Sequence, residues 1–331
     1  MSAAAGQPPV RLFFDLAHEE TWHRRELEAR LSEATSTTEA TLVSSPDSAD
    51  CVLSTVSRYN FGPGSRIFRA DPLQPPHGHP PTFVWYANDH PTGRLPGFYC
   101  SLPRPLFDPH LHRTFCYPFR YNECIQPFDL GDARYLYAFV GGLTSGLRHR
   151  LLASLAAAER AEERLIQVQS GPWDRMFDRS GIAPKTTYAD ALRRTRFFLC
   201  PRGNGVSSIR LFETMQAARV PVIISDAFVP PADIDWSRCS VFIRERDLHS
   251  LPSILRERAT DWPSLASTAR QIWETHFSDA VVLHQLGRHT RALLSSLPAS
   301  HLRSDLAYYR RVTPHALRVA LLHLMRRIQS R

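Results

Sequence analysis

The stretch FLCPRGNGVSSIRLFETMQAARVPVIISD, residues 198–226, constrains the fold more than any other part of the chain. A short apolar run enters a Gly-Asn-Gly turn, a helix is predicted to open at Ser207 and Ser208, and a second apolar run covers residues 220–224. Two strands joined through a helix form a βαβ unit, whose strands must be parallel. The sequence therefore predicts an α/β protein with a mainly parallel sheet.

The same alternation of strands and helices runs through the rest of the chain. VRLFFDL, ATLVSS, DCVLSTV and FVWYA predict strands in the first third, and GFYCSL is a further apolar segment in a region rich in proline and glycine. Trp22, Leu27 and Leu31 have helical spacing. A second cycle starts with YLYAFVGG, which predicts a strand and a glycine turn, followed by a helix over residues 147–164. LIQVQS and RFFLC predict further strands, ADALRRT predicts a helix between them, and residues 251–297 predict two or three surface helices.

Two such cycles in 331 residues predict two domains, which we place at residues 1–130 and 131–300. A basic amphipathic helix is predicted within residues 301–331. That helix could make a peripheral contact with an anionic membrane, but an apolar stripe of this kind is also ordinary for a helix that packs on a globular protein. We favour packing.

The net charge of +8 does not have the form of a nucleic-acid binding surface. Lys185 is the only lysine among 40 basic residues, the arginines are spread along the chain, and no zinc-finger, homeodomain or RNP-like motif is present. Six scattered cysteines without a CxxC pair are typical of reduced thiols. We expect no nucleic-acid partner and a cytoplasmic location, because the sequence has no apolar run of about 18 residues and no signal peptide.

Two histidine pairs lie in proline-rich segments, His77 and His79 in PPHGHPP and His110 and His112 in DPHLHR. Neither pair has the second pair of ligands that a structural zinc site needs. We interpret all four as solvated loop histidines and expect no metal site.

The turn RGNGVSSIR lacks the Lys-Ser/Thr pair of a Walker A loop, and it matches a Rossmann fingerprint only in part, because Ser208 replaces the third glycine. The physics that these motifs share still applies. Gly203 and Gly205 allow a sharp turn and a close approach of the backbone to a ligand. The first amides of the following helix favour an anion, and Ser207 and Ser208 could cap that helix or donate to phosphate oxygens.

Two arginines flank the turn and a carboxylate follows them. Arg202 and Arg210 are suited to bidentate phosphate contacts. Glu213 is three residues past Arg210 on the same helix face, where it could accept hydrogen bonds from a ribose diol. The pattern predicts a nucleoside diphosphate site; the alternative is a glycine turn without a ligand, next to a surface Arg210–Glu213 ion pair that contributes little.

Residues 197–257 resemble the signature region of the exostosin-like glycosyltransferases. The pattern is Cys-Pro-Arg-Gly, then Ser-x-Arg-x-x-Glu, then Pro-Val-Ile-x-Ser-Asp, with looser similarity back to Tyr137 and through Arg148. The resemblance implies a GT-B fold, in which two Rossmann-like domains face each other across a cleft and the second domain holds the nucleotide-sugar. It also implies inverting transfer of a hexosyl or glycuronosyl group from a UDP-sugar to a polysaccharide or another glycan.

The resemblance assigns roles to individual residues. Arg202 and Arg210 would hold the diphosphate, Glu213 would hold the ribose, and the two serines of the turn would lie at the phosphates. Asp226 would face the sugar or the acceptor, and Glu245 stands where the family tends to carry a glutamate. The predicted donor-binding residues are Arg148, Arg202, Gly203, Gly205, Ser207, Ser208, Arg210, Glu213, Asp226 and Glu245.

The chain departs from the family in three respects. Arg219 stands where relatives have a small or neutral residue, the membrane anchor of the Golgi relatives is missing, and the first 130 residues match no family. An inverting transfer needs a general base, and we predict Asp89, which follows the apolar strand FVWYA. The segment Asn88-Asp89-His90-Pro91 is equally a good turn sequence.

One alternative function stays open, a catalytically silent relative that binds a nucleotide-sugar or a glycan as a partner or scaffold for another transferase. The intact set of Arg202, Arg210 and Glu213 favours an active enzyme. The arginines and the helix N-terminus would stabilise the departing diphosphate, so we expect neither a metal nor a cofactor besides the sugar donor.

Overall fold

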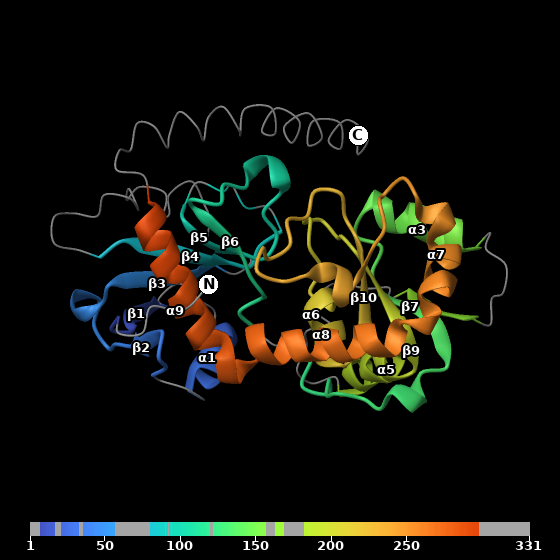
Figure 1. The fold of residues 1–331 in the computed structure, drawn as a ribbon, viewed down its shortest axis with the longest axis horizontal. Helices are drawn as coiled ribbons and strands as arrows, with labels where there is room; N and C mark the ends of the chain where they lie inside the picture. The colour runs from blue at the N-terminus through green and yellow to red at the C-terminus, as the bar shows by residue number, and fades with distance from the viewer. Residues whose placement is uncertain are drawn as a thin grey trace.

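The structure is a computed structural model that describes residues 7–16, 21–32, 36–56, 80–89, 91, 93, 95–119, 122–156, 163–168 and 182–297. It contains two parallel sheets that lie side by side, each with helices packed on it (Figure 1). The predictions for the C-terminal basic helix, for His77 and His79, and for His90 fall outside the described residues.

The first sheet has the strand order β2-β1-β3-β4-β5-β6, and all neighbouring strands are parallel. All four apolar runs predicted as strands in the first third are strands, and the apolar segment GFYCSL also contains one. Leu27 and Leu31 of helix α1 (Thr21–Ser32) are buried, as their helical spacing predicted. The strands are β1 (Val10–Asp15), β2 (Ala40–Leu42), β3 (Cys51–Val56), β4 (Thr82–Tyr86), β5 (Gly97–Tyr99) and β6 (His112–Thr114).

The second sheet has the order β11-β10-β9-β7-β8, again with parallel neighbours. Its strands are β7 (Tyr135–Gly141), β8 (Arg164–Val168), β9 (Thr195–Pro201), β10 (Val220–Ile224) and β11 (Val241–Phe242). Its helices are α3 (Gly146–Ala156), α5 (Ile182–Arg193), α6 (Arg210–Gln216), α7 (Leu251–Glu257) and α8 (Trp262–His276). Short 3-10 helices cover Pro46–Ser48, Arg104–Leu106, Leu130–Asp132, Trp236–Arg238, Leu248–Ser250 and Arg258–Thr260.

Both sheets have the same topology when their strands are numbered within each sheet. The order is 2-1-3-4-5, with one more strand at the end of the first sheet. In each sheet the second strand lies on one side of the first strand and the third strand lies on the other side. The strand order therefore reverses between β1 and β3 in the first sheet and between β7 and β9 in the second. Ligands of α/β sheets bind outside the carboxyl ends of the strands at such a switch point.

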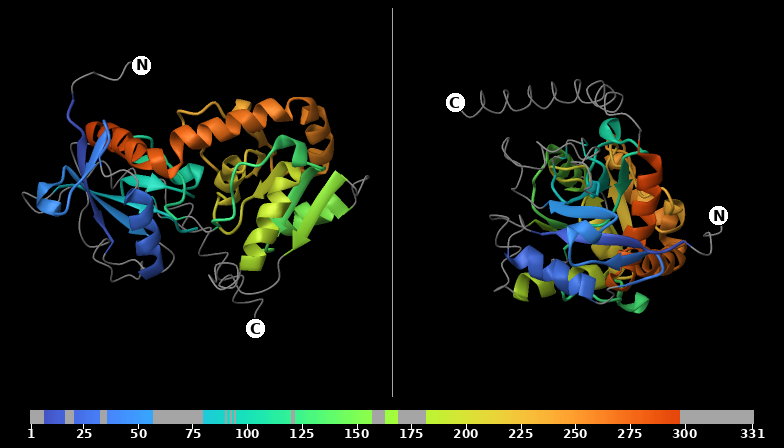
Figure 2. Two further views of the ribbon diagram at one scale, coloured as in Figure 1. Left: turned by 90° about the horizontal axis from the view of Figure 1, so that it is seen from below. Right: turned by 90° about the vertical axis from the view of Figure 1, so that its left-hand side faces the viewer.

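Helix α9 (Asp279–Ser296) follows the second domain in sequence but packs on the first sheet. It contacts β1, β2 and α1, and Val282, Leu283 and Leu286 are buried in the core of the first domain. Helices α8 and α9 thus connect the two halves along one side of the molecule (Figure 2). None of the described helices is long and apolar enough to cross a bilayer.

The predicted α/β class and the GT-B arrangement of two Rossmann-like domains are confirmed. Three local predictions are wrong. The helix predicted to open at Ser207 begins at Arg210, because Ser208 and Ile209 form a tight turn that leads into it. The helix predicted to reach residue 164 cannot do so, since Arg164 starts β8. His112 is not a solvated loop residue: it is fully buried in β6, and its Nδ1 accepts a hydrogen bond from the Asp108 amide.

Candidate active site

Two loops meet at the switch point of the second sheet, one between β7 and α3 and the other between β9 and α6. The Ser145 hydroxyl of the first loop donates to the Arg202 carbonyl oxygen of the second, at 3.2 Å. A Cβ on Gly203 would lie only 3.2 Å from Thr144 Oγ1 and 3.3 Å from Arg148 Nη2. The glycine turn is therefore closely packed at the place where α/β proteins bind ligands.

Two buried arginines lie beneath these loops. Arg148 on α3 is 2% exposed and Arg210 on α6 is 3% exposed. Both guanidinium groups approach the Phe139 ring, at 5.8 and 6.0 Å from its centroid. The carbonyl oxygens of Gly142 and Pro201 accept hydrogen bonds from Arg148, and the Val140 carbonyl accepts one from Arg210 Nε at 2.6 Å. Among the described residues, neither arginine makes an ion pair with a carboxylate.

This packing places two positive charges close together in a region of low polarity. Burial and, to a smaller extent, the nearby charge of Arg210 lower the pKa of Arg148 to about 9, although Asp89 acts in the opposite direction. Like charges that are removed from water disfavour each other's charged form. An anion bound between them would relieve this repulsion, so the electrostatics of the region favour an anionic ligand.

Several polar groups around the turn are buried and lack a hydrogen-bond partner among the described residues. They are Ser207 Oγ, Ser208 Oγ, Thr144 Oγ1 and Arg148 Nε. Each unsatisfied buried group costs about 1–3 kcal/mol. Folded proteins rarely leave several such groups together, and a catalytic or ion-binding role is one accepted reason. The serines do not cap helix α6 as predicted, because its N-cap residue is Ile209.

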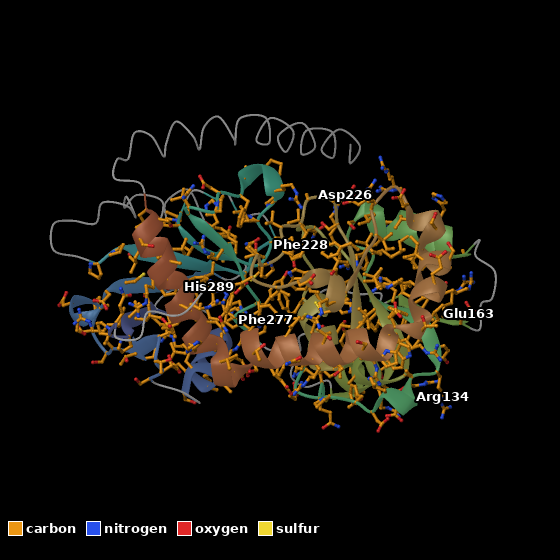
Figure 3. All side chains as sticks on the ribbon, in the orientation of Figure 1. Arg134, Glu163, Asp226, Phe228, Phe277 and His289 are labelled. Carbon is orange, nitrogen blue, oxygen red and sulfur yellow. The ribbon has the colours of Figure 1, made fainter. Side chains whose placement is uncertain are left out.

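Arg202 makes its bidentate contact with a carboxylate of the protein. Its Nε lies 2.6 Å from Glu245 Oε1 and its Nη2 lies 3.1 Å from Oε2. The Glu245 amide donates to Asp226 Oδ1 at 3.0 Å, so three of the predicted residues form one network. Burial is the largest single effect and raises the pKa of Glu245, but the hydrogen bonds and the charge of Arg202, with smaller contributions from its other neighbours, together lower the pKa. Asp226 lies at the exposed edge of this network (Figure 3).

Glu213 lies deeper than a surface ion pair would place it. The Tyr188 hydroxyl donates to its Oε2 at 2.8 Å, and burial raises the pKa of Glu213 although Arg210 opposes the shift. Because Arg210 is buried and held by Val140, the alternative of a surface Arg210–Glu213 pair is wrong. Glu213 also lines a small open pocket between the domains, together with Tyr117 and Phe119 of the first domain.

Two residues of the first domain contact the glycine turn of the second domain. Asp89 follows β4 and Ser101 follows β5. The Val206 and Ser207 amides donate to Ser101 Oγ at 2.8 and 3.1 Å. A Cβ on Gly205 would overlap Ser101 Oγ and lie 2.9 Å from Asp89 Oδ1. The carboxylate predicted as the general base is thus placed against the turn predicted to hold the donor.

Three residues of this region were not identified from the sequence. Thr144 and Ser101 follow strands β7 and β5, and a systematic search for polar residues just after each predicted strand would have found them. Tyr188, the partner of Glu213, lies inside helix α5, and no pattern in the sequence marks it. No group of three or more metal-ligating side chains occurs in the parts of the chain that the structure covers.

Comparison with known proteins shows which families and structures the chain resembles. Residues 131–258 match the family profile described as the Exostosin GT47 domain. We call this part of the chain, which is similar to that family, the exostosin-like domain. All ten predicted donor-site residues, Arg148 included, lie within residues 131–258.

Curated relatives share the region of the exostosin-like domain with moderate identity. An Exostosin-1 homolog of Caenorhabditis elegans is 32% identical over 102 residues, which cover 29% of this chain and 26% of the relative. Exostosin-1 of Drosophila melanogaster is 33% identical over 93 residues, which cover 27% of this chain and 12% of the relative. The chain therefore spans a small part of the length of these relatives.

Three solved structures resemble the chain at low sequence identity. TarM covers 73% of this chain at 12% identity and a TM-score of 0.44, and the match covers 54% of TarM. A glycosyltransferase from Rickettsia africae covers 89% at 8% identity and a TM-score of 0.45, over 100% of its own length. Anabaena HepE in complex with UDP covers 87% at 11% identity and a TM-score of 0.40, also over 100% of its length.

Proposed function

We propose that this chain is an inverting glycosyltransferase that moves a sugar from a UDP-sugar to a polysaccharide or another glycan acceptor. One observation carries the proposal: Arg148 and Arg210 are buried side by side at the switch point, held by carbonyl oxygens and next to unsatisfied hydroxyl groups. A diphosphate would supply the negative charge and the oxygen acceptors that these groups lack.

The same groups would stabilise the leaving nucleotide. When the bond between the sugar and the diphosphate breaks, negative charge develops on the diphosphate, and fixed positive groups in a water-poor site stabilise it strongly. Arg148, Arg210 and the serine hydroxyls of the turn would do this without a metal ion. Glu213 would accept hydrogen bonds from the ribose hydroxyls, because Arg210 partly offsets the effect of burial on its charge.

Asp89 would act as the general base from the first domain. It would take the proton of the acceptor hydroxyl while that oxygen attacks the anomeric carbon from the side opposite the diphosphate. The new carbon–oxygen bond forms as the bond to the diphosphate breaks, which inverts the anomeric configuration. The position of Asp89 against Gly205, across from the buried arginines, supports this role.

The binding test compares two arginines of the exostosin-like domain. Arg210→Ala should weaken UDP binding by roughly 1.5–3 kcal/mol, since it removes charge-assisted hydrogen bonds to the diphosphate. Arg238→Ala, a change at an exposed residue of the same domain, should leave it unchanged. Calorimetric titration with UDP, GDP, ADP and CMP measures both. Equal UDP affinity in the wild type and a folded Arg210→Ala variant would remove the proposed donor site.

The kinetic test addresses Asp89. Asp89→Asn should lower turnover by about 10²–10⁴-fold, the usual contribution of a general base, and change UDP affinity little. Turnover of the wild type should also survive EDTA. An Asp89→Asn variant that turns over at the wild-type rate would place the base elsewhere, and loss of activity in EDTA that divalent cations restore would contradict a metal-free mechanism.

A second candidate function, a silent binding relative, is favoured by one specific contact. Arg202, predicted to hold the diphosphate, is paired with Glu245, so its charge is already balanced. Incubation with a UDP-sugar and a glycan acceptor distinguishes the two functions, because only an active transferase releases UDP from the sugar donor. Binding of UDP without release of UDP from the sugar donor, in the presence of many acceptors, would favour the silent relative.

A further inference from the structure

The first domain contacts two loops of the second domain, those after β9 and after β10, through residues 101–104, which we call the interdomain latch. At one end of the latch, Ser101 Oγ accepts hydrogen bonds from the Val206 and Ser207 amides, at 2.8 and 3.1 Å. At the other end, the Arg104 amide donates to the Ala227 carbonyl at 2.8 Å and Arg104 Nη2 donates to the Phe228 carbonyl at 3.0 Å. Phe228 lies where the two domains meet (Figure 3). The latch therefore bridges the loop after β9 and the loop after β10.

The contact at Ser101 uses groups that are suited to an anion. Two successive backbone amides that converge on one oxygen form a small cationic recess that binds anionic oxygens. Here the recess is filled by a neutral hydroxyl. An anionic oxygen forms a stronger hydrogen bond with the same amides, so a phosphate oxygen could replace the hydroxyl but could not share its position.

The closed contact leaves neighbouring groups without partners. Ser207 and Ser208 are 7% and 6% exposed, and their hydroxyl oxygens have no hydrogen-bond partner among the described residues. The latch thus satisfies the amides of the turn but shuts its hydroxyls away from water. A ligand that reached the turn would satisfy both sets of groups, which the latch cannot do.

Gly205 makes this closure possible. A Cβ at this position would overlap Ser101 Oγ and would also lie 3.0 Å from the Cα of Asp89. The first domain can therefore approach the turn this closely only because residue 205 has no side chain. Ser101 is itself 1% exposed, so no solvent separates the two domains at this point.

We propose that the interdomain latch keeps the empty donor site closed, and that a diphosphate oxygen of the donor displaces the Ser101 hydroxyl from the Val206 and Ser207 amides. This inference rests on the proposed function, because it takes the nucleoside diphosphate as the displacing ligand. The free energy that holds the latch shut is subtracted from that of donor binding, so the apparent affinity of the wild type is lower than the affinity of the open site.

The experiment weakens the latch at each end separately. Ser101→Ala removes the hydroxyl that occupies the amides, and Arg104→Ala removes the contact with Phe228 at an exposed residue, where the fold tolerates the change. Both variants should bind UDP roughly threefold to tenfold more tightly than the wild type, as expected for the loss of one competing hydrogen bond. Ser48→Ala is the matched control, because Ser48 is an exposed residue of the first domain whose hydroxyl donates to Ser45.

Calorimetry with UDP gives the affinities, and hydrogen exchange of the peptide over residues 203–209 gives the state of the turn without a nucleotide. UDP binding by Ser101→Ala and Arg104→Ala that is equal to or weaker than that of the wild type would overturn the proposal, even if Arg210→Ala confirms the donor site. If no variant binds a nucleoside diphosphate, the proposed function fails. Faster hydrogen exchange of residues 203–209 in Ser101→Ala than in Ser48→Ala would then still show that the latch closes the turn. Equal hydrogen exchange in the two variants would show that it does not.

Discussion

Arg219, which departs from the exostosin-like pattern, has a structural role in this chain. The side chain is completely buried and donates hydrogen bonds only to backbone carbonyl oxygens, those of Phe128, Asp129, Leu192, Arg193 and Ala218. Two of these carbonyls end helix α5, where the helix dipole favours a positive charge. Burial lowers the pKa of Arg219 to about 10, so the group remains charged at neutral pH. This residue ties the chain between the domains to the second domain and has no direct part in the candidate site.

Glu213 combines a proposed function with a cost in stability. Burial is the main cause that raises its pKa above the usual 4.5, and Arg210 and the Tyr188 hydroxyl only partly counteract it. A carboxyl group with a raised folded pKa contributes stability that is present below its unfolded pKa and is lost as the pH rises through the folded value. The charged form of Glu213 therefore destabilises the fold at neutral pH.

Glu213→Gln should for this reason increase the free energy of unfolding relative to the wild type at pH 7.5, and much less so at pH 4. Urea unfolding at the two pH values measures the difference. Glu28→Gln, a change at an exposed residue of α1, serves as the control and should show no such dependence. The same Glu213→Gln variant should bind UDP more weakly. A loss of stability at pH 7.5 would contradict the assigned direction of the pKa shift.

The residues of the candidate site were largely predictable from the sequence, but their partners were not. The glycine turn, its two arginines and Glu213 lie within one short segment, so a local pattern identifies them. Their contacts come from residues far away in the chain, such as Glu245 for Arg202 and Ser101 for the turn. Sequence spacing carries no information on contacts of this kind, and for that reason Arg202 was assigned to a phosphate instead of to Glu245.

At the level of elements, strands were predicted more reliably than helix ends. The strands of a parallel sheet are buried on both faces, so they are marked by apolar runs such as VPVII of β10. Helix ends depend on tertiary contacts. Helix α6 begins at Arg210 and not at Ser207, since the amides of Val206 and Ser207 are turned toward Ser101 of the other domain.

The docking of helix α9 depends on one glycine. A Cβ on Gly287 would lie 2.5 Å from the Glu39 carbonyl oxygen and 2.6 Å from Ala40 Cβ, so the helix can approach β2 only without a side chain there. In an isolated helix, Gly→Ala stabilises by about 0.5–1 kcal/mol. Here the clash with rigid backbone should outweigh that gain, and Gly287→Ala should lower the free energy of unfolding by about 1–3 kcal/mol.

Gly146→Ala is the matched control for this prediction, because the nearest atom to a Cβ on Gly146 is Arg150 Nη1 at 3.9 Å. Gly146 opens helix α3, so its change to alanine should be neutral or slightly stabilising. Urea unfolding of both variants measures the two effects. Equal stability changes in the two variants would show that α9 does not pack on β2 as closely as described.

At the scale of the whole molecule, two repeated cycles of strands and helices predicted the two-domain α/β architecture correctly. The prediction placed the helices of residues 251–297 on the surface of the second domain, but α9 covers the first sheet. An amphipathic pattern shows that a helix has an apolar face, and it does not show which sheet that face covers. The interdomain latch escaped prediction for the same reason, since both of its contacts join the two domains.

The packing of helix α9 on the first sheet has a consequence for folding during synthesis on the ribosome. Chains emerge from the amino terminus, and domains usually fold as they appear. Here the first sheet is complete in sequence after β6, but Val282 and Leu286 of α9, which cover it, are made more than 160 residues later. Until then its apolar face remains uncovered, so the first half of the molecule must wait for nearly the whole described chain before it can finish folding.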